Sequence, residues 1–380
     1  MIKVLHLITS LDTGGAEKML FKLLSGMDRK QFENRVVCLL SPGSVEKQIT
    51  DLGIKVETLN LKRGRISFGG ILNLIKMIKK WHPDIIQTWL YHADLLGYLA
   101  ARLTGIKNLI WNIRCTRMEL EKYSRVTAWT VKACAFFSSY PVSILANSDM
   151  AKDQHIHTYG YNNKKFQIIL NGFDLSVFKP DREAGKKIRQ ELDIPEDSMC
   201  VGLVGRYDPQ KDHLSFIRAA SIVTQRFPDM IFVLAGKNVD MNNSEIIYLI
   251  KEMKLNNNFR LLGERSDIPD IMNAMNVYCS SSAFGEGFPN VVGEAMACGL
   301  PCVVTDIGQS ASIVDHTGFV VRPGNHDELA DSIIKLTSLP GDQLKKLGEE
   351  ARERVAKYYS LEKIVKEYEN LYLTIADLNC

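Results

Sequence analysis

Short runs of apolar and β-branched residues alternate along the chain with longer stretches whose apolar residues recur at helical spacing. In the first half these runs predict strands at Val4–Ile8, Arg35–Leu40, Val56–Leu59, Ile85–Thr88, Leu109–Asn112 and Ser143–Ala146. Helices are predicted over Glu17–Met27 and Gly70–Trp81, the second with apolar Ile71, Leu74, Ile75 and Ile78. Strands that alternate with helices are typical of a parallel sheet built from βαβ units.

The same pattern begins again after a turn at residues 171–180, NGFDLSVFKP. The second set of predicted strands is Val201–Val204, Ile231–Ala235, Phe259–Leu262, Val277–Ser280, Cys302–Thr305 and Gly318–Val321. The sequence therefore predicts an α/β protein with two doubly wound parallel-sheet domains, at 1–174 and 175–359. Ligands of such sheets bind beyond the carboxyl ends of the strands, so we expect the two domains to face each other across a ligand cleft.

The composition is that of an ordinary globular protein, with 46% hydrophobic and 24% charged residues in 380. Eight scattered cysteines without a C-x-x-C pair indicate reduced thiols rather than a zinc site or a disulfide framework. The start, MIKVLHLITS, lacks the features of a signal peptide, and the apolar stretch Val126–Ala146 is interrupted by Lys132 and Pro141. We expect a cytoplasmic protein.

The net charge of +3 conceals an uneven distribution. Residues 1–172 contain 24 Lys+Arg and 13 Asp+Glu, whereas the rest of the chain contains 23 and 31. Positive charge beside apolar residues suits an anionic membrane surface or an anionic lipid-linked substrate, although a solvated helix face is the better explanation for any single lysine. No nucleic-acid module is recognisable, so nucleic acid is not expected as a partner. Many of the basic residues of the first half lie close together between positions 62 and 81, beside one tryptophan: Lys62, Arg63, Arg65, Lys76, Lys79, Lys80 and Trp81.

A Gly-rich loop at residues 280–294, SSSAFGEGFPNVVGE, follows a predicted buried strand and leads into a helix. Small residues let a backbone approach a ligand closely, and the amides at a helix N-terminus bind phosphate oxygens. Glu294 falls one turn into this helix, where a carboxylate can accept the two hydroxyls of a ribose. A tight strand-to-helix turn is the simpler alternative, but two glutamates eight positions apart, Glu286 and Glu294, argue against it.

This E-x7-E pattern, within FGEGFPNVVGEAMACGLPCVVTDIG, resembles the retaining GT-B glycosyltransferases of family four. The resemblance extends over nearly the whole chain, because LDTGGAEKML, NGFDLSVFKP, VGRYDPQKDH and LLGERSDIPDIMNAMNVYCSSS follow in the family's order. It implies an N-terminal acceptor-binding domain, a C-terminal nucleotide-sugar-binding domain, and a final helix at 360–380 that crosses back to the N-terminal domain. It also implies transfer of a hexose or N-acetylhexosamine from a UDP-sugar, with retention and with no cofactor or metal.

The resemblance also assigns roles to single residues. Arg206 and Lys211 are expected to neutralise the donor diphosphate, and Glu286 to face the transferring sugar. Gly14 and Gly15 are expected to close over the donor, and Glu294 to bind the ribose. The expected donor-binding residues are Gly14, Gly15, Arg206, Lys211, Glu286, Gly287, Phe288, Pro289, Asn290, Val291 and Glu294.

Two departures from the family's pattern affect the expected site. Relatives often have H-x-H where this chain has Gln87, Thr88 and Trp89, so the nearby His92 is expected to take the catalytic role of the histidine; packing at a helix start is its alternative. Trp89 is expected to stack on an acceptor sugar, with core packing equally plausible, and Arg114 to meet an acceptor phosphate. The segment TDIGQSASIV lacks the second glycine and the glutamate that relatives have, which obscures the identity of the donor sugar.

The resemblance favours front-face attack, in which the departing phosphate takes the acceptor proton and positioning supplies most of the catalysis. Together with the basic N-terminal half, it predicts a transferase for a lipid-linked oligosaccharide of the cell envelope, peripheral at the inner face of the membrane. Two alternatives stay open at this point. One is another GT-B enzyme, such as a soluble disaccharide synthase or a 2-epimerase, and the other is a non-catalytic nucleotide-sugar-binding partner of an active transferase.

Overall fold

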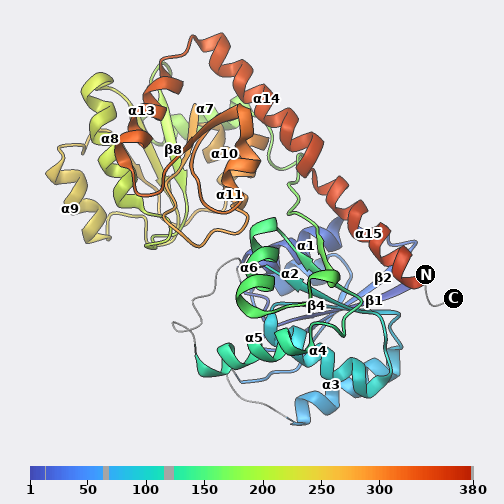
Figure 1. The fold of residues 1–380 in the computed structure, drawn as a ribbon. Helices are drawn as coiled ribbons and strands as arrows, with labels where there is room; N and C mark the ends of the chain where they lie inside the picture. The colour runs from blue at the N-terminus through green and yellow to red at the C-terminus, as the bar shows by residue number, and fades with distance from the viewer. Residues whose placement is uncertain (13, 63–67, 115–123, 378–380) are drawn as a thin grey trace. The chain divides into compact units, whose positions relative to one another are not determined.

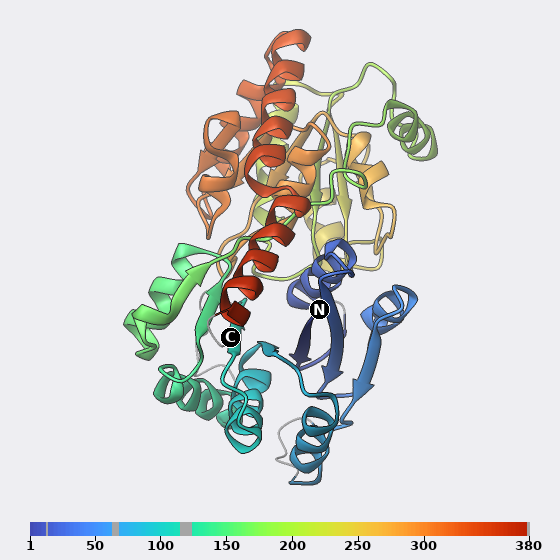
Figure 2. The ribbon, with the colours of Figure 1, turned by 90° about the vertical axis from the view of Figure 1, so that its right-hand side faces the viewer.

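The computed structural model describes residues 1–12, 14–62, 68–114 and 124–377, and the chain divides into two compact units. Unit 1 consists of Met1–Gly172 together with Leu361–Cys380, and unit 2 is Phe173–Ser360 (Figure 1). The last helix of the chain therefore belongs to the same unit as the first strand, and Figure 2 follows it in dark red to the C-terminus.

Unit 1 is built on a seven-stranded sheet in the order β3-β2-β1-β4-β5-β6-β7, in which every pair of neighbours is parallel. Residues such as those of β4 and β5 are buried without exception, which explains why these strands are nearly continuous apolar runs. The strands are β1 (Ile2–Ile8), β2 (Phe32–Cys38), β3 (Lys55–Thr58), β4 (Ile85–Trp89), β5 (Leu109–Ile113), β6 (Ser143–Ala146) and β7 (Phe166–Ile168).

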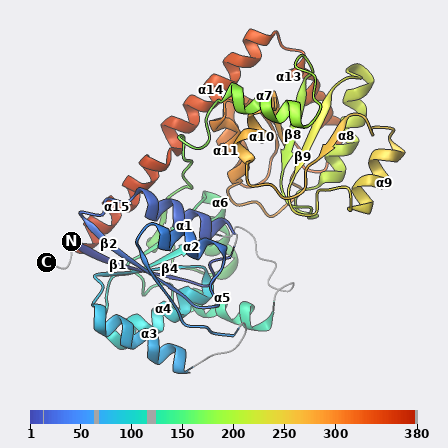
Figure 3. The ribbon, with the colours of Figure 1, turned by 180° about the vertical axis from the view of Figure 1, so that it is seen from behind.

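Helices cover both faces of this sheet and enclose a core on each side. Helices α3, α4 and α5 lie on one face, whereas α1, α2 and α15 lie on the other (Figures 1 and 3). The helices of unit 1 are α1 (Gly15–Gly26), α2 (Ser44–Asp51), α3 (Phe68–Trp81), α4 (Tyr91–Thr104), α5 (Arg125–Phe137), α6 (Asp149–Tyr159), the 3-10 turn η2 (Asn163–Lys165) and α15 (Leu361–Asp377).

Unit 2 contains a six-stranded parallel sheet in the order β10-β9-β8-β11-β12-β13. Its strands are β8 (Cys200–Val204), β9 (Ile231–Ala235), β10 (Phe259–Leu261), β11 (Val277–Ser280), β12 (Cys302–Thr305) and β13 (Gly318–Val321). Its helices are α7 (Arg182–Glu191), α8 (His213–Arg226), α9 (Ser244–Glu252), α10 (Ile268–Asn273), α11 (Asn290–Ala297), α12 (Ser310–Val314), η3 (Asp315–Thr317), α13 (His326–Thr337) and α14 (Gly341–Tyr359).

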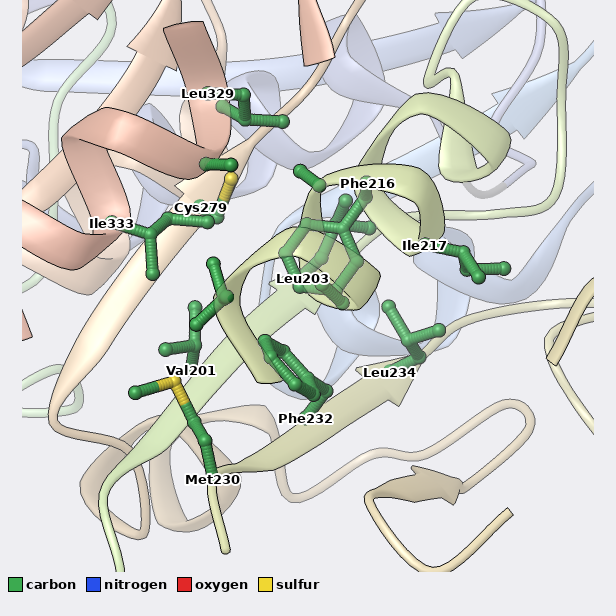
Figure 4. Packing of buried hydrophobic residues seen from close by; sticks show 14 of the residues in the cluster. Val201, Leu203, Phe216, Ile217, Met230, Phe232, Leu234, Cys279, Leu329 and Ile333 are labelled. Carbon is green, nitrogen blue, oxygen red and sulfur yellow. The ribbon is translucent and has the colours of Figure 1, made fainter. Parts of the chain in front are cut away.

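The core of unit 2 packs helices α8 and α13 against the sheet (Figure 4). Phe216 of α8 meets Phe232 of β9 edge to face at 5.8 Å between ring centroids, and Leu329 of α13 belongs to the same cluster. An edge-to-face pair of aromatic rings adds to the free energy gained by burying their area. The core thereby fixes the backbone of β8, from whose end the candidate site begins.

The predicted fold class is confirmed, because both sheets are parallel and helices alternate with strands in each. All twelve predicted strands are present, with ends that differ by up to three residues. Strand β7 was not predicted, since its three residues are partly exposed and carry little apolar signal. Among the described residues no helix is both long enough and apolar enough to cross a membrane.

Candidate functional site

The strand order of unit 2 reverses between β8 and β11. From β8 the chain proceeds outward to β9 and β10, and then returns to the other side of β8 with β11, β12 and β13. At such a reversal the loops after the two central strands separate and leave a crevice at the carboxyl edge of the sheet, where ligands of doubly wound proteins bind. The loops concerned are residues 205–212 and 281–289.

The first loop begins with a close approach between two backbone segments. Gly236, with a φ of +151°, lies so near the first loop that a Cβ on it would be 2.1 Å from the carbonyl oxygen of Gly205. Arg206 follows, and its Nε donates to Asp208 Oδ2 at 3.1 Å while its Nη2 donates to Gln210 Oε1 at 3.3 Å. Both contacts leave the guanidinium at the surface of the loop, since 58% of the side chain is exposed.

Lys211 and Glu286 form an ion pair that joins the two loops. Their side chains are only 15% and 11% exposed, so solvent screens this pair far less than a surface pair. Ser282 donates to the same glutamate oxygen, Oε1, at 3.1 Å. The carboxylate is therefore held from two sides through one of its oxygens.

Three glycines shape the loop around Glu286. Gly285 has a φ of +76° and Gly308 a φ of +62°, both in the region that a side chain disfavours. A Cβ on Gly308 would lie 2.3 Å from the carbonyl oxygen of Glu286, so only glycine fits between the two loops. The carbonyl of Gly287 accepts a hydrogen bond from the amide of Gln309 at 3.1 Å, which ties the loop to the segment after β12.

Helix α11 starts at Asn290, directly after this loop, and Val291 is its second residue. Its N-cap is Pro289, which supplies no side-chain hydrogen bond to the first turn. Glu294 lies one turn further along and is partly buried. A helix start without a side-chain cap, directly after a loop whose Glu286 pairs with Lys211, is chemically suited to an anionic ligand.

Phe288 anchors the same loop to the core of unit 2. It is buried and packs against Phe173 and Tyr359, with ring centroids 5.9 Å away in both cases. Gly293 of α11 leaves room for Phe173, because a Cβ on it would lie 2.1 Å from the ring. The structure therefore gives Phe288 a packing role, and only its backbone remains for the ligand.

His213 begins helix α8 below the first loop and is buried. Its Nε2 donates to the carbonyl of Gly205 at 3.2 Å, which requires the proton to be on Nε2. Burial lowers the pKa of His213 to about 4, and the nearby Lys211 acts in the same direction. The imidazole is thus neutral at pH 7 and supports the backbone of the loop.

Unit 1 has its own reversal of strand order, between β1 and β4. Gly14, the N-cap of α1, and Gly15, its exposed first residue, follow β1, while His92 is the second residue of α4 after β4. Leu90, between β4 and α4, has φ 74° and ψ 152°, a strained backbone conformation for a leucine. The two glycines and His92 therefore flank one switch point, and their roles toward the donor stay predictions.

The structure corrects the expectation for Trp89. Its side chain is fully buried at the end of β4, where its ring stacks on Tyr368 of α15 and its Nε1 donates to His6 Nδ1 at 3.4 Å. A ring that has no surface on the outside of the unit is not available to an acceptor sugar. The packing alternative therefore describes this residue.

Arg114 has partners inside unit 1. Its guanidinium lies 5.0 Å from the ring centre of Trp89 and donates to Tyr368 Oη and Asn171 Oδ1. Desolvation lowers the pKa of Arg114, and the hydrogen bond to Tyr368 acts in the opposite direction. These contacts explain Arg114 as a link between β5 and α15, and they do not test its predicted contact with an acceptor phosphate.

Sequence reasoning missed the groups that hold the predicted residues in place. Ser282 positions Glu286, and Gln210 and Asp208 fix Arg206. The only signal for Ser282 is its place in the serine run before the Gly-rich loop, and nothing in the sequence separates it from its neighbours. Within the part of the chain that the structure describes, no group of three or more His, Cys, Asp or Glu side chains could hold a metal ion.

Two family models match the chain, one in its N-terminal half and one in its C-terminal half. The model "Glycosyltransferase Family 4" matches residues 13–177, and "Glycosyl transferases group 1" matches residues 185–354. The chain is 26% identical, over 379 residues, to the UDP-Gal:alpha-D-GlcNAc-diphosphoundecaprenol alpha-1,3-galactosyltransferase of Escherichia coli, with 98% of this chain and 97% of that protein covered.

It is also 26% identical, over 374 residues, to the N-acetylgalactosamine-N,N'-diacetylbacillosaminyl-diphospho-undecaprenol 4-alpha-N-acetylgalactosaminyltransferase of Campylobacter jejuni, covering 95% of this chain and 96% of that protein. Among solved structures, Anabaena Alr3699/HepE in complex with UDP superposes with a TM-score of 0.85 at 22% identity, covering 98% of this chain and 100% of that one. With both halves matched in order, this chain is a glycosyltransferase of family four with the GT-B fold.

Proposed function

We propose that this glycosyltransferase moves a hexose or N-acetylhexosamine from a UDP-sugar to a lipid-linked saccharide of a bacterial envelope polysaccharide, with retention at the anomeric carbon. The Lys211–Glu286 pair at the strand reversal of unit 2 carries the proposal. It sets a cation and a carboxylate side by side at the edge where such sheets bind nucleotides. A cation there suits the diphosphate of the donor, and a carboxylate suits the hydroxyls of its sugar.

The donor end of the proposal follows from charge. Lys211 and Arg206 supply two positive charges for the diphosphate, and the start of α11 supplies backbone amides. We assign Glu294, one turn into the helix, to the ribose, whose hydroxyls can donate hydrogen bonds to its carboxylate. Two names among the relatives agree with this, since the E. coli enzyme uses UDP-Gal and the Anabaena protein was solved with UDP.

The sugar end follows from Glu286. Both of its contacts, with Lys211 and Ser282, are made by Oε1. We assign Oε2 to the hydroxyls of the transferring sugar, so that the carboxylate orients the sugar while its charge stays balanced by the lysine. Fixed orientation of this kind reduces the entropy that the transition state must lose.

The reaction then needs no separate general base. As the bond from the anomeric carbon to the β-phosphate oxygen breaks, negative charge grows on that oxygen, and Lys211 and Arg206 stabilise it. The acceptor hydroxyl attacks on the same face, and its proton passes to the departing phosphate oxygen. The new glycosidic bond therefore keeps the anomeric configuration of the donor.

The charge of unit 1 and the names of two relatives support the proposed acceptor. Residues 1–172 contain 24 Lys+Arg against 13 Asp+Glu, which favours an anionic acceptor. Diphosphate-linked undecaprenol carriers occur in the names of both the E. coli and the Campylobacter relatives. We therefore expect the enzyme to work at the inner face of the cell membrane on a polyisoprenyl diphosphate saccharide.

The test is donor binding followed by product analysis. Thermal unfolding is recorded with UDP-Gal, UDP-Glc, UDP-GlcNAc, GDP-Man and ADP-Glc, for the wild type, for Glu294→Gln, and for Glu252→Gln as a matched control on α9. We expect one UDP-sugar to stabilise the wild type and the control but not Glu294→Gln. That donor is then incubated with a short-chain polyisoprenyl diphosphate saccharide, and NMR identifies the anomer formed; an inverted product, or stabilisation by a GDP- or ADP-sugar alone, contradicts the proposal.

A further inference from the structure

The outer face of the helix layer α3, α4 and α5 in unit 1 carries large apolar side chains that are exposed among the described residues. Trp129 is 75% exposed, Phe136 81% and Leu103 61%, and Leu72 of α3 is also exposed. The inner sides of the same helices belong to the core, through residues such as Leu74 and Cys134. The three helices lie side by side on one face of the sheet (Figures 1 and 3). Since their inner sides face the core, we place the exposed apolar side chains on the outer side of this layer.

This surface, which we call the basic helix face, has charge of a single sign. The three helices contain six basic residues and one carboxylate, Asp94, which is fully buried. By contrast, α1, α2 and α15 on the opposite face contain two, one and two lysines against one, two and four carboxylates. Among these six helices, the excess of positive charge therefore lies on one side of the sheet. The basic residues of the face are Lys76, Lys79, Lys80, Arg102, Arg125 and Lys132, all exposed.

On α5 the two kinds of side chain alternate along one line. Arg125, Trp129, Lys132 and Phe136 are separated by four, three and four positions, the spacing of neighbours on one side of a helix. An aromatic ring and a long cationic side chain on the solvent side of a helix are characteristic of helices that lie in a membrane interface. The rings enter the boundary between headgroups and acyl chains, while lysine and arginine reach the phosphates.

We propose that the basic helix face binds the surface of a membrane that contains anionic lipids. The inference rests on the proposed function only in naming a lipid-linked acceptor as the reason for such a surface. A second copy of the chain is disfavoured as the occupant, since a two-fold contact would bring the same six cations face to face. Free phosphate would explain the cations but not the exposed Trp129 and Phe136. Arg63 and Arg65, which the sequence groups with the lysines of α3, lie outside the described residues.

The proposal is tested by flotation of the full chain with vesicles of phosphatidylcholine alone or with 30% phosphatidylglycerol, a composition of about one anionic lipid in three. We expect binding only to the anionic vesicles, and weaker binding at high salt because counterions screen the lysines. The triple variant Lys76→Gln, Lys79→Gln, Lys132→Gln is expected to bind about tenfold more weakly or worse. The charge-matched control Lys47→Gln, Lys363→Gln, Lys366→Gln, on the opposite face, is expected to bind as the wild type does.

A second pair of variants tests the apolar part. Trp129→Ser with Phe136→Ser is expected to reduce binding to anionic vesicles at high salt, where the apolar contribution dominates. Its control is Met241→Ser with Tyr248→Ser, two exposed apolar residues of unit 2. Circular dichroism is used to check that all variants are folded. We expect them to be folded, because the substituted residues are exposed.

Three outcomes overturn the proposal: no binding of the wild type to anionic vesicles, equal loss in variants and controls, or self-association that the variants abolish without any vesicle binding. Hydrolysis of the UDP-sugar without vesicles separates this inference from the proposed function. If hydrolysis persists while vesicle binding is absent, only the membrane surface is wrong. If vesicle binding persists while no nucleotide sugar binds, only the proposed donor is wrong.

Discussion

Lys211 and Glu286 meet from loops 75 positions apart, and each lowers the cost of burying the other. If Lys211 is removed, the Glu286 carboxylate stays largely buried beside Ser282. If Glu286 is removed, the Lys211 ammonium stays largely buried, with the side chain beside Gly205. The pair therefore has two functions in one contact. It holds the two loops of unit 2 in register, and it keeps a cation at the edge of the sheet.

We expect Lys211→Met to reduce the rate of sugar transfer by about 10²–10³-fold, because it removes one fixed positive charge from the leaving diphosphate. The readout is the initial rate at saturating donor and acceptor. Lys335→Met on the exposed side of α13 provides the control and is expected to transfer at the wild-type rate. A Lys211→Met enzyme of normal rate would show that the lysine only holds the loop.

The pKa of His213 gives unit 2 a specific response to acid. Its value of about 4 in the folded chain lies below the ordinary value of about 6.5, so between these pH values the unfolded chain binds the extra proton. The free energy of unfolding therefore falls as pH falls from 6.5 to 4, by at most about 1.4 kcal/mol per pH unit for one histidine.

His213→Gln keeps a donor for Gly205 but does not titrate, so its unfolding should depend less on pH in this window. Denaturant titrations at several pH values between 4 and 7 measure the difference. His157→Gln, on helix α6 of unit 1, is the control, and equal pH slopes in wild type and His213→Gln would exclude a role for this histidine.

Residues of the candidate site differ in how far sequence could predict them. Glu286 and Glu294 belong to one local pattern, so the sequence alone predicts both as site residues. The surroundings of Trp89 have no such signal, because Tyr368, which covers its ring, comes from the last helix of the chain. Sequence spacing carries no information about such a partner, and an aromatic residue at the end of a strand suits a core and a sugar equally well.

At the level of elements, the glycines after β11 and β12 decide how closely two loops approach. Gly308 has a φ of +62°, and a Cβ on it would lie 2.3 Å from the Glu286 carbonyl oxygen, so alanine meets both backbone strain and a clash with atoms that cannot turn aside. The segment after β12 can accept alanine only by moving the Glu286 loop. This makes Gly308 a determinant of the site although it contacts no ligand in our proposal.

Gly308→Ala is therefore expected to destabilise unit 2 by about 1–3 kcal/mol and to weaken donor binding more than its stability loss explains. Gly324→Ala is the comparison, since Gly324 also has a positive φ, +71°, but no atom lies within 4 Å of its Cβ position. Thermal unfolding with and without UDP measures both effects. Equal UDP binding in the two variants would show that the Glu286 loop is not displaced.

Elements were predictable where burial is complete and continuous. Strands such as β8 and β9, buried at every position, appear in the sequence as uninterrupted apolar runs. Strand β7, which pairs with β6 at the edge of its sheet, has no such run, because the polar and exposed Gln167 interrupts its three residues. Its hydrogen bonds to that neighbour, and not its side chains, define it as a strand.

At the scale of the whole molecule, each unit encloses its own cores, and the last helix completes unit 1. Tyr368 and Tyr372 of α15 are buried in the core of unit 1. The Tyr368 hydroxyl accepts a hydrogen bond from Asn112 Nδ2, and the Tyr372 hydroxyl donates one to Gln87 Oε1. Unit 2 ends at Ser360, which forms an isolated bridge with Phe173. Stability of the two units should therefore be separable.

We expect calorimetry to resolve two unfolding transitions, one for each unit. UDP should stabilise only unit 2, raising its free energy of unfolding by about 2.7 kcal/mol when UDP is at 100 times its dissociation constant. Ending the chain after Ser360 should lower or abolish the transition of unit 1 and leave the other in place, because α15 supplies part of only one core. A single transition that shifts as a whole with UDP and with the truncation would contradict this separation.

The position of α15 at the end of the chain also affects the order in which the protein can fold during synthesis. Proteins emerge from the ribosome N-terminus first, and their domains generally fold in that order. Here the N-terminal unit lacks Tyr368 and Tyr372 until its last segment has been translated, whereas unit 2 is complete once Ser360 has emerged. The second unit can therefore fold first, whereas the β-sheet of unit 1, with α1 and α2 but not α15 on one of its faces, gains its last helix only after residues 361–377 have been translated.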